Sequence, residues 1–341
     1  MRNKLRIITL EPIEQRYTKQ WYNSFKENFS KWFDVIYIDG HKGLEEGIKK
    51  GRFLDVNKTN YVKAEQVKKL SLMFQENKIK NGDIFLFMDG WHFGITALKY
   101  MAQLNNIKIK IFTYLHAGTW DLHDFITQAG LREWAVGNEL GWFRAVDGSF
   151  VATEFHKELI SKYFNKYINT DKIHVVGFPM DWKKEIDKHI PILPVKENIV
   201  VFPHRLDDEK RPQMFNLLAK QLPQYKFIKT LDVTRNKKEY YELLSKAKIV
   251  FSASKQETFG IGTVEGLMLG CVPVVPNKLS YKELYSYRFR YKNISTIKKK
   301  INFIMKNYGD RLLKATMKKD REKIKKQSLE SFKKMMEVML K

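Results

Sequence analysis

Residues 254–276 read SKQETFGIGTVEGLMLGCVPVVP, and this stretch decides the fold. Apolar runs at residues 249–252 and 272–275 bound it, so the pattern predicts a strand, a glycine-containing turn, a helix and a second strand. A turn of this kind presents backbone N–H groups where the helix begins, and a phosphate group binds there without needing a metal. The sequence therefore predicts a nucleotide-binding loop at this turn.

Two glutamates flank the predicted turn and are expected to contact different ends of one ligand. Glu257 lies before the turn, where a sugar attached to the phosphates would sit. Glu265 lies further on in the helix, where a carboxylate accepts hydrogen bonds from the vicinal hydroxyls of a ribose. Two acids at this spacing also arise by chance, and the competing interpretation is a buried helix in some other α/β protein.

A second polar cluster follows the apolar run NIVVFP at residues 198–203. The loop HRLDDEKR at 204–211 comes next, and Pro212 opens a helix that extends to residue 219. Ligands of parallel sheets bind beyond the carboxyl ends of the strands, so Arg205 and Lys210 are expected at the same edge as Glu257. Two cations there suit a diphosphate, although a solvated loop of mixed charge has the same composition.

These two segments resemble the donor-binding motifs of the retaining GT-B glycosyltransferases. Arg205 and Lys210 match the R-x4-K diphosphate clamp of that family, and the E-x7-E motif is matched by Glu257, Thr258, Phe259, Gly260, Ile261, Glu265, Gly266, Gly270, Pro273, Val274 and Val275. The resemblance implies an α/β fold of two Rossmann-like domains whose parallel sheets face a central crevice. It implies a nucleoside-diphosphate sugar, UDP-sugar above all, as co-substrate, with Glu257 catalytic and Arg205, Lys210, residues 258–261 and Glu265 binding the donor. No cofactor and no metal are expected.

Strands and helices alternate along the chain, which is the pattern of parallel sheets. The expected strands are residues 5–10, 35–38, 84–88, 109–114, 150–153 and 173–176, followed by 199–203, 226–229, 249–252 and 272–275. The sequence predicts an acceptor domain at 1–178, a crossover with two prolines at 179–197, a donor domain at 198–305, and a basic helical tail at 306–341 that packs back toward the first domain.

The N-terminal half offers two candidate catalytic residues, each placed directly after an expected strand. His116 follows residues 109–114 and resembles the active-site histidine that many GT-B relatives carry near the donor sugar. Asp89 follows residues 84–88. The simpler interpretations are a hydrogen-bonded histidine at a strand end and a turn-forming aspartate before glycine. The spacing of His116, Asp121 and His123 matches no closed metal site.

Charge is the strongest compositional signal. The 341 residues hold 62 basic and 38 acidic side chains, a net charge of +24, which indicates a polyanionic partner or an anionic surface. A lysine-rich codon bias is the competing explanation. Cys271 is the single cysteine and fits a reducing compartment. Neither a secretory signal nor a membrane span is evident, so a cytoplasmic location is expected, in the host if the chain is phage-encoded.

The sequence leaves the acceptor open between three interpretations. Its cation surplus and Lys-, Asn- and Ile-rich composition are similar to bacteriophage glycosyltransferases that modify hydroxymethylated pyrimidines, which implies double-stranded DNA as partner. A transferase acting on a cell-envelope or lipid glycan at a membrane surface also uses cations. The third interpretation is a non-catalytic GT-B protein that binds nucleotides or nucleic acid. The oligomeric state is not indicated.

Overall fold

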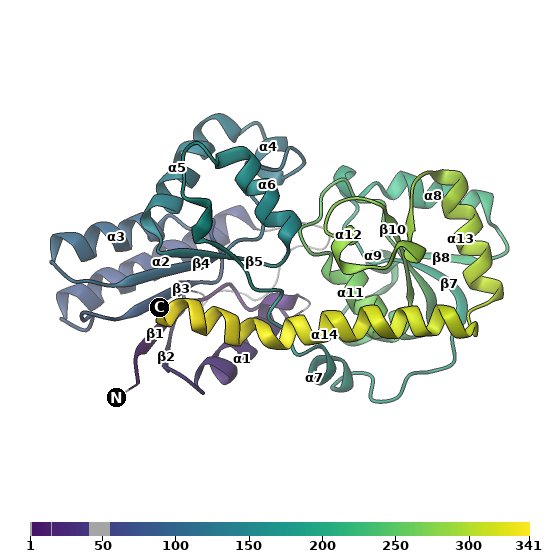
Figure 1. Ribbon diagram of the computed structural model, residues 1–341, viewed down its shortest axis with the longest axis horizontal. Coiled ribbons are helices and arrows are strands. Elements are labelled where there is room, and N and C mark those ends of the chain that lie inside the picture. The colour runs from purple at the N-terminus through teal and green to yellow at the C-terminus, as the bar shows by residue number, and fades with distance from the viewer. Residues whose placement is uncertain (1, 15, 41–54) are drawn as a thin grey trace. The chain divides into compact units, whose positions relative to one another are not determined.

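The computed structural model describes residues 2–14, 16–40 and 55–341, which form two compact units (Figure 1). The first unit contains the described residues up to Met180 together with 330–341, and the second contains 181–329. In the described parts of both units every paired strand runs parallel to its neighbour, as the alternation of strands and helices predicts. The expected α/β class is confirmed, and the expected domain limits stay a prediction.

The first unit is built on a sheet with the strand order β2-β1-β3-β4-β5-β6. Its strands are β1 (Lys4–Ile8), β2 (Asp34–Ile38), β3 (Ile84–Phe87), β4 (Lys110–Tyr114), β5 (Gly148–Val151) and β6 (Ile173–Val175). Its helices are α1 (Tyr17–Phe29), α2 (Val56–Gln75), α3 (Gly94–Leu104), α4 (Phe125–Gln128), α5 (Arg132–Ala145) and α6 (Glu154–Phe164), with a 3-10 turn at η1 (Thr170–Lys172). Apolar strands such as the fully buried IFLF of β3 are typical of sheets covered on both faces.

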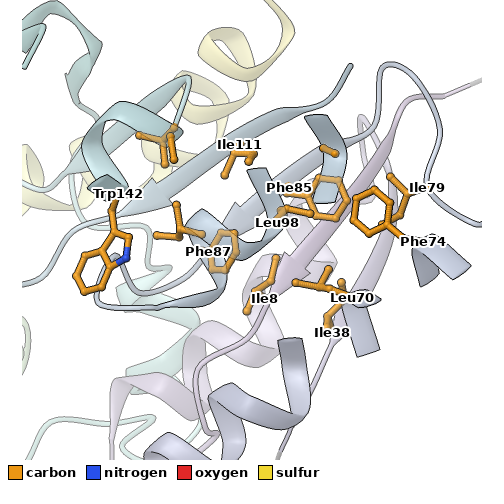
Figure 2. Packing of buried hydrophobic residues seen from close by; sticks show 14 residues of the cluster. Ile8, Ile38, Leu70, Phe74, Ile79, Phe85, Phe87, Leu98, Ile111 and Trp142 are labelled. Atoms are coloured by element: carbon orange, nitrogen blue, oxygen red, sulfur yellow. The ribbon is translucent and has the colours of Figure 1, made fainter. Parts of the chain in front are cut away.

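Helices α2, α3 and α5 cover one face of this sheet (Figure 2). Leu70 of α2, Leu98 of α3 and Trp142 of α5 pack against strand residues that include Phe85 and Ile111. The helix residues recur at helical spacing and the strand residues alternate, so both patterns turn their apolar side chains toward the same layer. Burial of this layer is the main force that holds the helices on the sheet.

An aromatic cluster covers the opposite face. Trp21 of α1 packs edge-on against Tyr114 of β4, with ring centroids 4.8 Å apart, and lies 4.9 Å from the ring of Phe178. Phe25 contacts Phe332 at a centroid distance of 5.3 Å. Phe332 belongs to the last part of helix α14 (Arg311–Leu340), so the end of the chain completes the core of the first unit.

The second unit has the strand order β11-β10-β9-β7-β8. Its strands are β7 (Glu197–Phe202), β8 (Lys226–Lys229), β9 (Ala247–Phe251), β10 (Val272–Pro276) and β11 (Arg290–Tyr291). Its helices are α7 (Trp182–Asp187), α8 (Pro212–Gln221), α9 (Thr230–Val233), α10 (Lys237–Lys246), α11 (Ile261–Met268), α12 (Tyr281–Leu284), α13 (Ile294–Lys306) and the first part of α14, with 3-10 turns at η2 (Asp208–Lys210) and η3 (Tyr287–Phe289). The two-residue strand β11 was not expected from the sequence.

Close packing of α11 on strand β9 positions the loop between them. A Cβ atom on Gly266 would lie 2.7 Å from side-chain atoms of Val250, so only glycine lets the helix approach the strand this closely. Helix α8 also packs on the sheet, because the ring centroid of Phe215 lies 5.2 Å from that of Phe202 in β7 and 6.0 Å from that of Phe251 in β9. The β9–α11 loop is therefore anchored at both ends by a rigid core.

Candidate functional site

The turn between β9 and α11 has the geometry of a helix-start anion site. Gly260 caps the helix with φ +83°, a left-handed conformation that favours glycine. A Cβ atom there would lie 2.9 Å from Cε1 of Tyr281. The Thr263 hydroxyl donates to the Gly260 carbonyl oxygen at 2.8 Å and holds the turn. The first N–H groups of the helix, including that of Ile261, are thereby presented at the carboxyl end of the sheet.

Glu257 and Lys210 form an ion pair beside this turn. Lys210 Nζ lies 2.9 Å from Glu257 Oε1 and donates to the Gln256 carbonyl oxygen at the same distance. Both side chains are largely buried, with 9% and 14% of their surfaces exposed. Burial alone would raise the pKa of Glu257, but the charges of Lys210, His204 and Arg205 and the Lys210 hydrogen bond lower it overall. Glu257 is therefore held as a carboxylate.

Arg205 and His204 complete this group. The Arg205 guanidinium pairs with Asp207 at 2.5 Å and with Glu209 at 3.1 Å, so its charge is already compensated within its own loop. His204 Nδ1 lies 3.6 Å from Glu257 Oε1. Burial lowers the pKa of His204 to about 4, so its ring is neutral near pH 7. The buried Nε2 atom of His204 has no hydrogen-bond partner in the described part of the chain.

Glu265 lies in a different cluster from Glu257. It is only 3% exposed, and Oε1 accepts hydrogen bonds from Lys237 Nζ and, at 3.0 Å, from the Tyr241 hydroxyl. Oε2 accepts from the Tyr240 hydroxyl at 2.9 Å. The three donors come from helix α10, so α10 fixes the carboxylate that the sequence predicts to bind a ribose.

The remaining predicted donor residues differ in exposure. Phe259 is buried, with its ring stacked near that of Trp182 at an interplanar angle of 8° and a centroid distance of 6.4 Å. Thr258 is half-buried in the loop. Phe259 thus locks the loop against α7, and Gly260 and Ile261 form the helix start.

In the first unit, His116 follows β4 and packs against the rings of Tyr17, Trp21 and Tyr114. Its Nε2 atom is 2.9 Å from the carbonyl oxygen of Met88, which makes Nε2 the protonated nitrogen, and Nδ1 is 3.4 Å from the Tyr17 hydroxyl. Burial is the main cause that lowers the pKa of His116, although Asp89 acts in the opposite direction. The imidazole is therefore neutral near pH 7.

Asp89 lies close enough to His116 for each to shift the pKa of the other. Its Oδ2 atom is 3.2 Å from Lys63 Nζ, and its Oδ1 atom accepts from the amide of Trp91 at 3.1 Å. Burial would raise the pKa of Asp89, but Lys63, His116 and the Trp91 amide lower it overall. A small hollow opens beside Asp89, and Glu11 is among its lining residues. The structure brings Asp89 and His116 together as an ionised acid beside a neutral base.

The described residues contain no group of three or more His, Cys, Asp or Glu side chains arranged to hold a metal ion. In the same residues no helix combines the length and apolar composition that crossing a bilayer requires.

Comparisons with solved structures give the fold. Over 100% of this chain and 99% of the other, the backbone matches the catalytic domain of starch synthase IV from Arabidopsis thaliana, bound to ADP and acarbose, with a TM-score of 0.67 and 9% identity. Sucrose-phosphate synthase from Thermosynechococcus elongatus matches over 99% and 97% of the two chains, with a TM-score of 0.65 and 12% identity. The chain has the GT-B fold.

Two further similarities cover only part of the other protein. TarM from S. aureus, in complex with fondaparinux, alpha-GlcNAc-glycerol and UDP, matches 80% of this chain and 59% of its own, with a TM-score of 0.55 and 17% identity. In sequence, 65 residues are 35% identical to the tRNA-queuosine alpha-mannosyltransferase of Drosophila melanogaster, which is 19% of this chain and 17% of that protein. No family model matches the sequence.

Several residues of this GT-B chain that contact the predicted site were not found from the sequence. They are His204 beside Glu257, Lys63 beside Asp89, and the α10 side chains around Glu265. Lys237, Tyr240 and Tyr241 do carry a signal, because residues spaced three and four apart share one face of a helix. Lys63 carries none, because it lies 26 residues before Asp89 in an ordinary surface helix.

Proposed function

We propose that the chain is a retaining glycosyltransferase that takes its sugar from a nucleoside-diphosphate sugar, with UDP-sugar as the expected donor. The observation that supports this proposal best is the Glu257–Lys210 ion pair, with 2.9 Å between its atoms, beside the left-handed turn at Gly260. It unites a carboxylate for sugar hydroxyls, a cation for phosphate and the N–H groups of a helix start. The nucleotides named with the starch synthase and TarM structures support the proposal.

The chemistry follows from the charges that develop as the glycosidic bond breaks. Negative charge grows on the leaving diphosphate, where Lys210, Arg205 and the amides at the start of α11 would stabilise it. A bound diphosphate would compete with Asp207 and Glu209 for the Arg205 guanidinium. Glu257 would accept hydrogen bonds from the sugar, and Glu265 from the ribose. In a front-face reaction the departing phosphate accepts the proton of the acceptor hydroxyl, so the donor side requires no separate base.

In the first unit we assign Asp89 and His116 to the acceptor side of the reaction. Asp89 is held as a carboxylate by Lys63 and can accept a hydrogen bond from a hydroxyl. His116 is neutral with Nε2 donating to the Met88 carbonyl oxygen, so Nδ1 is the acceptor nitrogen, and it lies 3.4 Å from the Tyr17 hydroxyl. Both roles require unprotonated side chains near pH 7, which the directions of their pKa shifts support.

For the acceptor we propose a hydroxymethylated pyrimidine in duplex DNA. The net charge of +24 supports a polyanionic acceptor, because each neutralised phosphate releases a counterion. The relative from Drosophila is named for a nucleoside of tRNA, and this favours a modified tRNA hydroxyl as the second candidate. Both acceptors are hydroxyl groups attached to a modified base in a polyanion.

Two measurements test the proposal. Calorimetry with UDP should show binding that Arg205→Ala weakens by about 1.5 to 3 kcal/mol, the range of charge-assisted bonds. Arg235→Ala, which removes an exposed arginine of the same unit, should leave the affinity unchanged. Absence of binding by any nucleotide at millimolar concentration would refute the donor assignment.

The second measurement is transfer of labelled sugar from a panel of nucleotide sugars. The acceptors are duplexes with hydroxymethylcytosine, hydroxymethyluracil or unmodified bases, bulk tRNA, and lipid-linked glycans. We expect label on a hydroxymethylated duplex and none on the unmodified one, and the anomeric configuration of the product reports retention. Label confined to tRNA would support the second candidate, and label confined to glycans would refute a nucleic-acid acceptor.

A further inference from the structure

Three cations of the second unit follow neighbouring strands at one edge of its sheet. Arg211 lies in the loop after β7, Lys255 in the loop after β9, and Lys278 directly beyond β10. Strands β10, β9 and β7 are adjacent and parallel, so their carboxyl ends lie together. The Lys255 amide donates to the Glu209 carbonyl oxygen at 2.7 Å, which ties the β9 loop to the β7 loop. This edge also carries Glu257.

No carboxylate of the described chain forms an ion pair with any of these three cations. The acids of the β7 loop and Glu257 are engaged elsewhere, because Asp207 and Glu209 pair with Arg205, Asp208 accepts from Gln213 and Glu257 pairs with Lys210. Burial, and then the charges of Arg211 and Lys255, lower the pKa of Lys278. The charges of Arg211 and Lys255 therefore act on Lys278, and none of the three cations has a carboxylate partner in the described chain.

Arg211 adds two further unfavourable features. Its backbone is left-handed at φ +57°, which costs about 1 to 2 kcal/mol for a residue with a Cβ atom. It is also the residue that caps α8, where the helix dipole disfavours positive charge. A bound anion would offset the charges that act on Lys278 and the conflict of Arg211 with the helix dipole. Lys255 and Lys278 are exposed, which suits a large polyanion better than a small enclosed one.

We propose that Arg211, Lys255 and Lys278 bind backbone phosphates of the duplex DNA that flanks the base to be glycosylated. This inference rests on the proposed function and deepens it, because it names the surface that holds the acceptor. The donor diphosphate has its own cations in Arg205 and Lys210. The position of Lys255, two residues before Glu257, places these phosphate contacts next to the donor loop.

The test compares two double variants of the full chain. Lys255→Gln with Lys278→Gln removes two of the proposed contacts. Lys220→Gln with Lys226→Gln removes two exposed lysines of the same unit at the opposite edge of the sheet, since Lys226 begins β8 and Lys220 lies in the last turn of α8. Fluorescence anisotropy gives the affinity for a hydroxymethylcytosine duplex at KCl concentrations from about 50 to about 300 mM. The dependence of affinity on salt over this range reports the number of counterions released on binding.

The slope of log affinity against log salt should fall in magnitude by about 2 for the first pair, close to 0.9 for each phosphate contact, and stay constant for the control pair. Arg211→Gly should reduce the slope by about 1 and raise the melting temperature, because it removes the backbone strain together with the charge. Equal slopes in all variants would overturn the proposal. So would equal reductions in both double variants, or a loss of binding to phosphatidylserine vesicles with duplex binding unchanged.

These readouts separate the two proposals. Calorimetry with UDP should give the same affinity for the wild type and for the first double variant, because neither lysine belongs to the donor clamp. If no sugar reaches any duplex while the slope still falls by about 2, the proposed acceptor fails and the phosphate surface stands. If duplexes are glycosylated and the slope does not change, the function stands and the phosphate surface fails.

Discussion

Trp91 Nε1 donates a 2.9 Å hydrogen bond to Oε1 of Glu139, and the same oxygen accepts from the Thr119 amide at 2.8 Å. Trp91 lies two residues after Asp89, and Thr119 lies three residues after His116. One buried carboxyl group on α5 therefore links the loops that carry both candidate acceptor-side residues. Glu139 is 1% exposed, and burial raises its pKa to about 7, with the hydrogen bonds from Thr119 and Trp91 acting in the opposite direction.

Glu139→Gln tests this arrangement through the pH dependence of stability. A pKa raised from 4.5 to about 7 means that the folded state keeps a proton that the unfolded chain loses. The stabilisation is complete below pH 4.5 and is lost as the pH rises through 7, a change of about 3 kcal/mol for a shift of this size. The glutamine keeps the shape of the side chain and accepts the hydrogen bonds from Trp91 and Thr119. The free energy of unfolding, measured with urea between about pH 4.5 and 8, should therefore lack this pH-dependent loss in the variant.

Glu133→Gln is the matched control, because Glu133 is exposed on the same helix. It should leave the pH profile as in the wild type. The interpretation fails if Glu139→Gln and the wild type lose stability in parallel over this range.

Glu139 also marks the limit of what the sequence could predict. Strand positions, the parallel sheets and the β9–α11 turn follow from patterns within about ten residues, which local periodicity captures. The partners of Glu139 lie 48 and 20 residues away, and nothing in the helix around it distinguishes it from a surface acid. The burial of Glu265 among α10 side chains is likewise a tertiary effect. The strands and the turn were predictable, whereas the groups that surround Glu139 and Glu265 depend on packing between remote segments.

His156→Leu is expected to make the protein more resistant to acid. The His156 side chain is fully buried, neither ring nitrogen has a hydrogen-bond partner among the described residues, and burial lowers its pKa to about 3. Because the unfolded chain binds a proton below pH 6.5 that the folded state does not, the free energy of unfolding is unaffected above pH 6.5 and decreases as the pH falls. The decrease is about 2 kcal/mol at pH 5. Thermal unfolding at pH 5 and pH 7.5 should show a smaller difference in the variant.

The remaining acid sensitivity in that variant should come from the other buried histidines, among them His92 and His204, whose pKa values burial lowers to about 3 and about 4. His123→Leu, at a half-buried position after β4, serves as the control and should keep the wild-type difference between the two pH values. An unchanged difference in His156→Leu would contradict the neutral, unpaired state of that ring.

Lys237→Met should lower stability by about 3 to 5 kcal/mol, because it leaves the Glu265 carboxylate buried without its cation. Tyr240→Phe removes one hydrogen bond to the same group and should lower stability by about 1 kcal/mol. Denaturant titration measures both. Adding Glu265→Gln to Lys237→Met should restore much of the stability while UDP binding stays weak, since the amide carries no charge to leave unpaired. Recovery of both properties together would exclude a ribose-binding role for Glu265.

Gly260→Ala should weaken both the fold and the binding of UDP. The residue has φ +83°, and the added Cβ atom would lie 2.9 Å from Cε1 of Tyr281, a fully buried ring whose hydroxyl is fixed at 2.7 Å from Ser252 Oγ. Neither strain nor contact can relax without moving the turn, so we expect a loss of about 1 to 3 kcal/mol in stability. UDP affinity should fall about tenfold or more, because the N–H groups of α11 lose their alignment.

Gly137→Ala provides the contrast, since this glycine lies inside α5 with open space around it. Alanine there should raise stability by about 0.5 to 1 kcal/mol and leave the affinity for UDP unchanged. Calorimetry that found full UDP affinity in Gly260→Ala would place the phosphates away from this helix start.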